Sequence, residues 1–116
     1  MNEKKIPYSF INEKDVMDRL GGNTALFNRL FGKYMTSYRA AAEEVKKLVD
    51  EKNYSDARLL VHTIKGTSAN LGISRMWELS AALEKAIIIE EEKAILSRLS
   101  DFASEMQNMI HEVDSL

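Results

Sequence analysis

The chain has 116 residues, of which 45% are hydrophobic and 29% are charged, with a formal net charge of −2 at pH 7. That length and hydrophobic fraction fit one domain with one core, and the small net charge gives no general attraction to nucleic acid. The absence of cysteine excludes a disulfide framework, a thiolate nucleophile and a cysteine-ligated zinc site.

No membrane or targeting segment is recognisable in the sequence. No apolar stretch approaches the roughly 18–20 residues that span a bilayer, and residues 1–7 lack the apolar centre of a secretory signal. We therefore expect a cytoplasmic module that binds neither nucleic acid nor membrane. Glycine and proline are few, so the composition favours helices.

The first predicted elements are an extended segment and two helices. Residues 1–11 are expected to be an extended lead-in, because their proline excludes a regular helix, and a short helix is expected over residues 12–20. From Phe27 to Leu48, apolar residues recur at alternating spacings of three and four. This pattern predicts one long helix of about 28 residues that begins after Asn23.

Three further helices are expected downstream. The first covers about residues 55–70 and stops at Gly72, a natural left-handed position. The second has Ser74 as its N-cap, and the third covers about residues 91–113. Together with the long helix they predict an all-α domain over residues 12–116, an antiparallel four-helix bundle with an additional short N-terminal helix.

His62 lies on the polar side of its predicted helix. At roughly 100° per residue, Leu60 and Ile64 lie about 160–200° from it, whereas Lys65 and Gly66 share its face. The imidazole is therefore expected in solvent, with a cation one turn on and a residue without a side chain beside it.

This arrangement suits a histidine that carries phosphate transiently, since histidine changes charge between about pH 5 and 8 and so offers a neutral ring nitrogen. Lys65 can reach phosphate oxygens, and Gly66 costs roughly 1 kcal/mol of helix propensity, which steric clearance for a partner explains. Each feature alone has a simpler interpretation: a surface histidine, a solvated lysine, or a glycine at a close helix contact. Their conjunction on one face favours phosphate chemistry.

The run that begins at His62 resembles the signature of histidine-containing phosphotransfer (HPt) domains. That signature is a histidine, any residue, an aliphatic residue, Lys-Gly, small residues, an aliphatic residue and a glycine. The chain supplies it in register with His62, Ile64, Lys65, Gly66, Ser68, Ala69, Leu71 and Gly72. The resemblance extends from about Phe10 onward, and Thr67 departs from it at a position where smaller residues are common.

The resemblance implies a role for each matching residue. His62 would accept the phosphoryl group through Nε2, and Lys65 would stabilise that group. Glu84 occupies the position at which family members have a Gln or Glu that orients the imidazole. The alternative is a surface glutamate paired with Lys85 or Lys93.

A receiver domain is the partner that the resemblance implies. We expect it to dock over Leu59 and Ala69, with Arg58 and Lys65 at the charged rim and Gly66 leaving room for it. Trp77, near this surface, is interpreted as a packing residue.

The implied function is to relay a phosphoryl group between receiver-domain aspartates in a two-component phosphorelay, by way of phospho-His62. The chain would be a monomeric phosphoryl carrier, not an enzyme, with no ATP site and no intrinsic cofactor, and the receiver would supply Mg²⁺. Its partners would be response-regulator receiver domains, a hybrid sensor histidine kinase, or both. Two alternatives stay open: the phosphate-accepting domain of a chemotaxis-type or hybrid histidine kinase, and a non-phosphorylated helical adaptor that binds a receiver.

Overall fold

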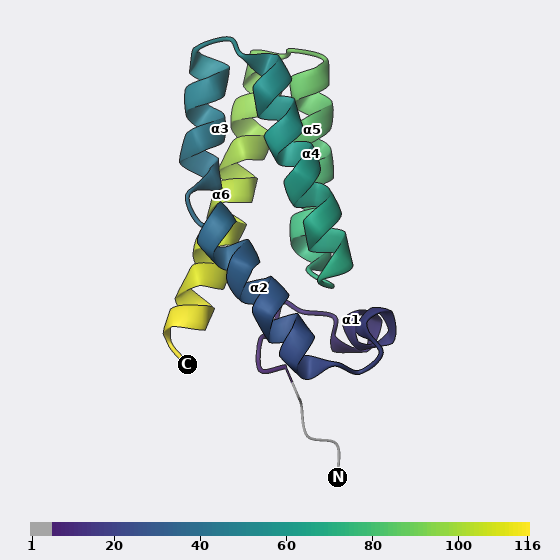
Figure 1. Cartoon of the computed structure of the whole chain (residues 1–116). Helices are drawn as coiled ribbons and strands as arrows, with labels where there is room; N and C mark the ends of the chain where they lie inside the picture. The colour runs from purple at the N-terminus through teal and green to yellow at the C-terminus, as the bar shows by residue number, and fades with distance from the viewer. Residues whose placement is uncertain (1–5) are drawn as a thin grey trace.

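The computed structural model describes residues 6–116, and in this part of the chain every regular element is a helix (Figure 1). The helices are α1 (Glu13–Leu20), α2 (Thr24–Tyr38), α3 (Ala41–Asp50), α4 (Tyr54–Asn70), α5 (Ser74–Ile88) and α6 (Glu92–Asp114). The all-α prediction is therefore confirmed. Within residues 6–116, none of these helices combines the length and the apolar character needed to cross a membrane.

Helices α3 to α6 stand side by side and form the bundle, and the C-terminal part of α6 extends beyond the start of α3 (Figure 1). Successive bundle helices are joined by residues 51–53, 71–73 and 89–91, and such short connections make neighbouring helices antiparallel. Every helix contributes at least one fully buried apolar side chain to the core: Val16, Phe27, Val45, Ile64, Leu83 and Phe102.

Local sequence sets most of the helix starts. The side-chain oxygens of Asn12, Asn23 and Asn53 accept hydrogen bonds from backbone amides in the first turns of α1, α2 and α4. The start of α5 differs from the prediction, because Ser74 is its first residue and Ile73 is the cap, without a side-chain capping hydrogen bond. The predicted N-cap is thus wrong by one residue.

The long helix predicted as one element is wrong, because α2 and α3 are separated at Arg39 and Ala40. The backbone of Ala40 leaves the helical region, with φ −102° and ψ 15°. The apolar spacing continues through the break at Tyr38, Ala41 and Val45, and neither glycine nor proline marks it. Because the two helices run in different directions, their apolar faces can pack against different neighbours. Helix α3 packs on α4 and α6, whereas α2 leans toward α1 (Figure 1).

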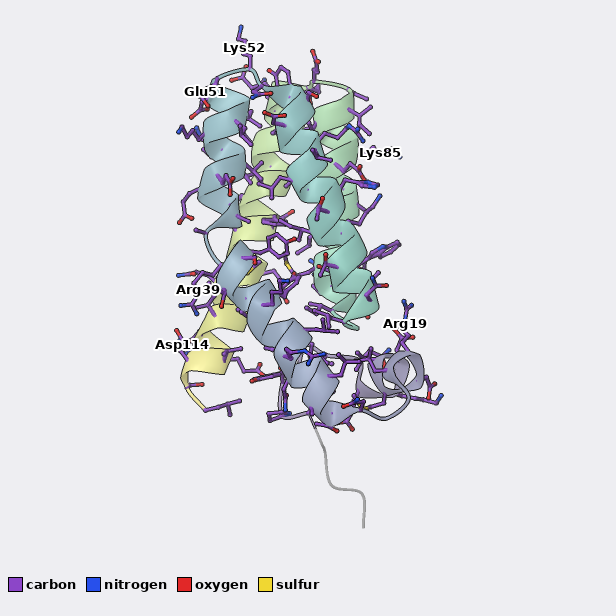
Figure 2. All side chains as sticks on the ribbon, viewed as in Figure 1. Arg19, Arg39, Glu51, Lys52, Lys85 and Asp114 are labelled. Atoms are coloured by element: carbon purple, nitrogen blue, oxygen red, sulfur yellow. The ribbon has the colours of Figure 1, made fainter. Side chains whose placement is uncertain are left out.

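An ion pair joins this break to the end of α6. Nη2 of Arg39 lies 3.4 Å from Oδ1 of Asp114, and both side chains point to the same edge of the molecule (Figure 2). Both are about half exposed, so the pair is worth no more than about 1 kcal/mol. The direction of α2 therefore depends on apolar packing more than on this pair.

The segment before α1 packs against α2. Residues 6–12 contain no helix, Ile6 is buried, and the ring of Tyr8 lies 4.8 Å from the ring of Phe31 between centroids. The first part of the predicted lead-in, residues 1–5, lies outside the described residues.

Gly72 should be a position where the fold does not tolerate a side chain. Its backbone is left-handed (φ 69°), and a Cβ atom there would lie 2.8 Å from the carbonyl oxygen of Asn12. The amide of Asn12 also donates a hydrogen bond to the carbonyl oxygen of Gly72 (2.8 Å), so the two segments cannot move apart freely. We expect Gly72→Ala to lower the free energy of unfolding, measured by urea denaturation, by more than about 2 kcal/mol.

Gly21 provides the matched control for this substitution. It is also left-handed (φ 62°) but has open space around it, so Gly21→Ala should cost only about 1 kcal/mol. Equal losses for the two variants would show that the contact with Asn12 is not the constraint.

Candidate functional site

The position of His62 on α4 makes its ring accessible. The helix turns Ala57, Val61, Ile64 and Ser68 into the core, and 56% of the His62 side chain is exposed on the other side. The predicted exposure of the imidazole is confirmed.

A buried carboxylate faces His62 from the next helix. Glu84, on α5, is only 6% exposed, and its Oε2 lies 2.7 Å from Nδ1 of His62. Its other oxygen, Oε1, accepts a hydrogen bond from Nζ of Lys65 at 2.5 Å, so one carboxylate holds two side chains of α4. Because Glu84 is buried and faces α4, the alternative of a surface glutamate paired with Lys85 or Lys93 is wrong.

The ionisation of Glu84 decides which nitrogen of His62 is free. Burial would raise the pKa of the Glu84 carboxyl, but hydrogen bonds from Lys65 and His62 outweigh burial and lower that pKa below its ordinary value. The ionised carboxylate can only accept hydrogen bonds, so Nδ1 of His62 carries a proton, and in the neutral ring the lone pair is then on Nε2. The nucleophilic nitrogen is thus the one on the far side of the ring from Glu84.

The packing around α4 holds this geometry in place. Ser80, one turn before Glu84 on α5, is fully buried, and α5 packs along α4. On the inner face of α4, the hydroxyl of Ser68 lies 2.9 Å from the hydroxyl of Tyr34 on α2. Burial raises the pKa of Tyr34 to about 12, so the phenol keeps its proton for this hydrogen bond.

The residues predicted to contact a partner surround His62 on α4. Leu59 is 59% exposed, Arg58 lies one turn before His62, and Ala69 is half-buried two turns after it. No atom comes within 4 Å of the place that a Cβ of Gly66 would occupy. Gly66 is therefore open on its outer side, and close packing between helices does not account for it.

Trp77, interpreted from the sequence as a packing residue, is only partly covered. Its exposed fraction is 45%, and with Ala69 it lines a hollow of about 450 Å³ at the end of α4. Its neighbour Met76 is buried instead, so helical position, and not side-chain size, decides which of the two faces the core.

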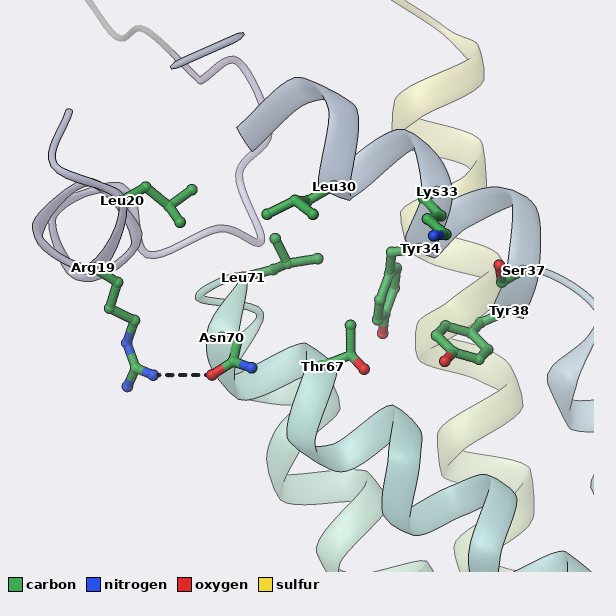
Figure 3. Close-up of a pocket in the computed structure, with 10 residues that line it drawn as sticks. All are labelled: Arg19, Leu20, Leu30, Lys33, Tyr34, Ser37, Tyr38, Thr67, Asn70 and Leu71. Carbon is green, nitrogen blue, oxygen red and sulfur yellow. Dashed lines mark hydrogen bonds between the residues drawn. The ribbon is translucent and has the colours of Figure 1, made fainter. Parts of the chain in front are cut away.

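A second hollow, of about 510 Å³, lies between α1, α2 and the end of α4 (Figure 3). Leucine and tyrosine side chains form much of its wall, and at its edge Arg19 donates a hydrogen bond to Asn70 at 3.5 Å. Neither hollow includes His62. The imidazole is presented on an open helix surface, which suits a group on another protein better than a small molecule enclosed in a cavity.

The arrangement has the chemistry of an oriented nucleophile beside an ionised acid. Among residues 6–116, no group of three or more His, Asp or Glu side chains is placed to hold a metal ion. Both oxygens of Glu84 already accept hydrogen bonds, from His62 and Lys65, so this carboxylate orients those two side chains.

Comparison with known families matches the bundle and the site within one segment of the chain. A model of the family described as the Hpt domain matches residues 29–116, which contain α3 to α6 and most of α2. His62, Lys65 and Glu84 all lie within the matched segment. No curated protein and no solved structure matches the chain.

Glu84 should make part of the stability depend on pH. Because its folded-state pKa is lowered, its contribution is present above the ordinary value of 4.5 and is lost as the pH falls through the folded-state value. We expect wild type to be more stable than Glu84→Gln at neutral pH, and this difference to shrink below about pH 4. Urea denaturation at a series of pH values measures the difference.

Glu78→Gln is the control for the pH series, since Glu78 is an exposed acid on the same helix. Its stability should follow that of wild type at every pH. A difference between wild type and Glu84→Gln that stayed constant down to about pH 3 would contradict the ionised carboxylate.

Proposed function

This chain belongs to the Hpt domain family, and we propose on that basis that it relays a phosphoryl group between receiver-domain aspartates through His62. The group would arrive from the aspartyl phosphate of one receiver and leave to the aspartate of another. The chain would act in two-component signalling as a monomeric carrier in the cytoplasm, and not as an enzyme with its own ATP site.

The hydrogen bond between Nδ1 of His62 and Oε2 of Glu84, at 2.7 Å, is the observation that supports the proposal most. It holds the ring in one orientation, so the nucleophile loses little rotational freedom when a phosphoryl donor arrives. The carboxylate that accepts from Nδ1–H also makes Nε2 a better nucleophile, in the way that such carboxylates tune histidines that bind metals. A merely exposed histidine would have neither property.

In the proposed step, the lone pair of Nε2 attacks the phosphorus atom of the receiver's aspartyl phosphate. One N–P bond forms, one P–O bond breaks, and the electron pair of the broken bond stays on the aspartate carboxylate. His62 keeps its proton on Nδ1, and the ring, now positively charged, lies against the carboxylate of Glu84. The receiver would supply Mg²⁺ and most of the charge stabilisation, whereas this chain supplies the positioned nucleophile.

A second candidate is the phosphate-accepting domain of a chemotaxis-type or hybrid histidine kinase. The ionised Glu84 beside His62 would serve a phosphoryl group that comes from ATP on a kinase domain equally well. The donor distinguishes the candidates: labelling by a kinase domain with ATP, but not by phosphorylated receivers, favours the second.

We expect His62→Gln to abolish acid-labile labelling by phosphorylated receivers, because no ring nitrogen remains to form the N–P bond. Helix content should be retained, since the side chain is exposed and a glutamine can still donate to Glu84. The measurement is transfer of radioactive phosphate from a panel of purified receivers.

His111→Gln is the control, because His111 is an exposed histidine on α6, and this variant should label like wild type. Labelling that persists in His62→Gln would contradict the proposal. Stable receiver binding without labelling of wild type would favour the non-phosphorylated adaptor.

Gly66→Leu should block receiver docking by bulk. The outer side of Gly66 is open, so a leucine there would fold without a clash and gain up to about 1 kcal/mol of helix propensity. We expect the rate of phosphoryl transfer to fall about tenfold or more, since a clash of about 1.4 kcal/mol is enough for that.

Gly66→Ala separates docking from helix stability, because it adds similar helix propensity with much less volume. Its transfer rate should stay within about threefold of wild type. Unchanged transfer in Gly66→Leu would show that a receiver does not approach over this residue.

A further inference from the structure

We propose that Arg58 binds the phosphoryl group carried by His62, and that Glu84 assigns Arg58 this role by holding Lys65. The inference rests on the proposed function. The family resemblance implies a phosphate contact for Lys65, and Arg58 was expected only at the rim of the docking surface; the contacts of the two side chains with Glu84 favour the other assignment.

Lys65 is already bound to a buried acid. Its Nζ lies 2.5 Å from Oε1 of Glu84, and only 27% of its side chain is exposed. Turning the ammonium group outward would leave the carboxylate of Glu84, 6% exposed, with His62 as its hydrogen-bond donor. Breaking a buried pair is more costly than breaking an exposed one, because little water replaces the lost partner. Lys65 therefore stays with Glu84.

Arg58 is near the same carboxylate without being hydrogen-bonded to it. Its Nη1 lies 3.6 Å from Oε2 of Glu84, longer than a hydrogen bond, and 46% of its side chain is exposed. A guanidinium group has five N–H donors, so Arg58 keeps donors for another anion. It also lines an open hollow of about 470 Å³ between the start of α4 and the end of α5, which gives the side chain room to move.

Helix geometry brings Arg58 to the ring of His62. The two residues are four positions apart, so they share one face of α4. Side chains of a helix lean toward its N-terminus, so the ring of His62 leans over the turn that carries Arg58. Both side chains approach Oε2 of Glu84, at 2.7 and 3.6 Å. A phosphoryl group on Nε2 would thus lie within reach of the guanidinium group.

The charges of the cluster also favour Arg58. The charges of Glu84 and Lys65 offset each other, whereas a phosphoryl group would bring about two negative charges. A planar guanidinium group can donate two parallel hydrogen bonds to two phosphoryl oxygens, which an ammonium group cannot. No covalent bond or proton of Arg58 changes, because the side chain exchanges its ion contact with Glu84 for hydrogen bonds to the phosphoryl group.

The test uses the full chain with His111→Gln, in which His62 is the remaining histidine. Phosphoramidate, which transfers its phosphoryl group to imidazole and releases ammonia, makes phospho-His62 without a protein partner. The ³¹P NMR signal of the phosphohistidine is followed against pH in this chain and in three variants of it: Arg58→Gln, Lys65→Gln and Arg98→Gln. Arg98, an exposed arginine on α6, is the matched control.

We expect Arg58→Gln to raise the pH midpoint of the ³¹P titration by about half a pH unit or more, because losing a nearby cation favours the protonated phosphoryl group. Lys65→Gln should raise the midpoint by less than Arg58→Gln does, and Arg98→Gln should not move it. Glu84→Gln releases Lys65, so in that background Lys65→Gln should have at least the effect of Arg58→Gln. A purely structural role of Arg58 would not produce this reversal.

Two results would overturn the inference: an unmoved midpoint in Arg58→Gln, or a larger shift in Lys65→Gln than in Arg58→Gln while Glu84 is intact. The same samples separate the inference from the proposed function. If chemically made phospho-His62 shows the Arg58 effect but no phosphorylated receiver labels His62, the phosphoryl contact stands and the relay proposal fails.

Discussion

The buried carboxylate of Glu84 is the group on which the rest of the site depends. An ionised carboxylate that is only 6% exposed is stable only with charged or hydrogen-bonding partners close to it, and α4 supplies Lys65 and His62. The hydrogen bonds that offset the cost of burying the charge of Glu84 between α4 and α5 also orient the imidazole of His62 and hold the ammonium group of Lys65. The same hydrogen bonds therefore serve the fold and the site.

This carboxylate also divides the site into an inner and an outer side. Nδ1 of His62 and Nζ of Lys65 face inward to Glu84, whereas Nε2 lies on the far side of the ring, and Arg58, 3.6 Å from Oε2 of Glu84, keeps 46% of its side chain exposed. A phosphoryl group would meet only the outer side. The inner side is held by close packing of α4 on α5, so His62 stands on a rigid element, and the open surface at Gly66 leaves room for the proposed partner.

Local structure was largely predictable because it depends on residues a few positions apart. The first helix was predicted to within one residue, the Asn23 cap placed the start of α2, and helical periodicity placed His62 on the exposed side of α4. Periodicity failed between α2 and α3, where the apolar spacing continues across Ala40 although the helix does not. Glu84 was predicted as the hydrogen-bond partner of His62 only through the family resemblance, because no spacing rule connects residues 22 positions apart.

By itself, the sequence determined which segments form helices and which of their faces are apolar, because propensity, capping and the period of 3.6 residues act within one turn or two. Only the tertiary structure decided that α2 and α3 part at residues 39 and 40, and that Glu84 is shared between His62 and Lys65. Each of these depends on burial against a segment distant in the chain. Burial also gives the carboxylate of Glu84 its hold on both side chains, because water no longer competes for its oxygens.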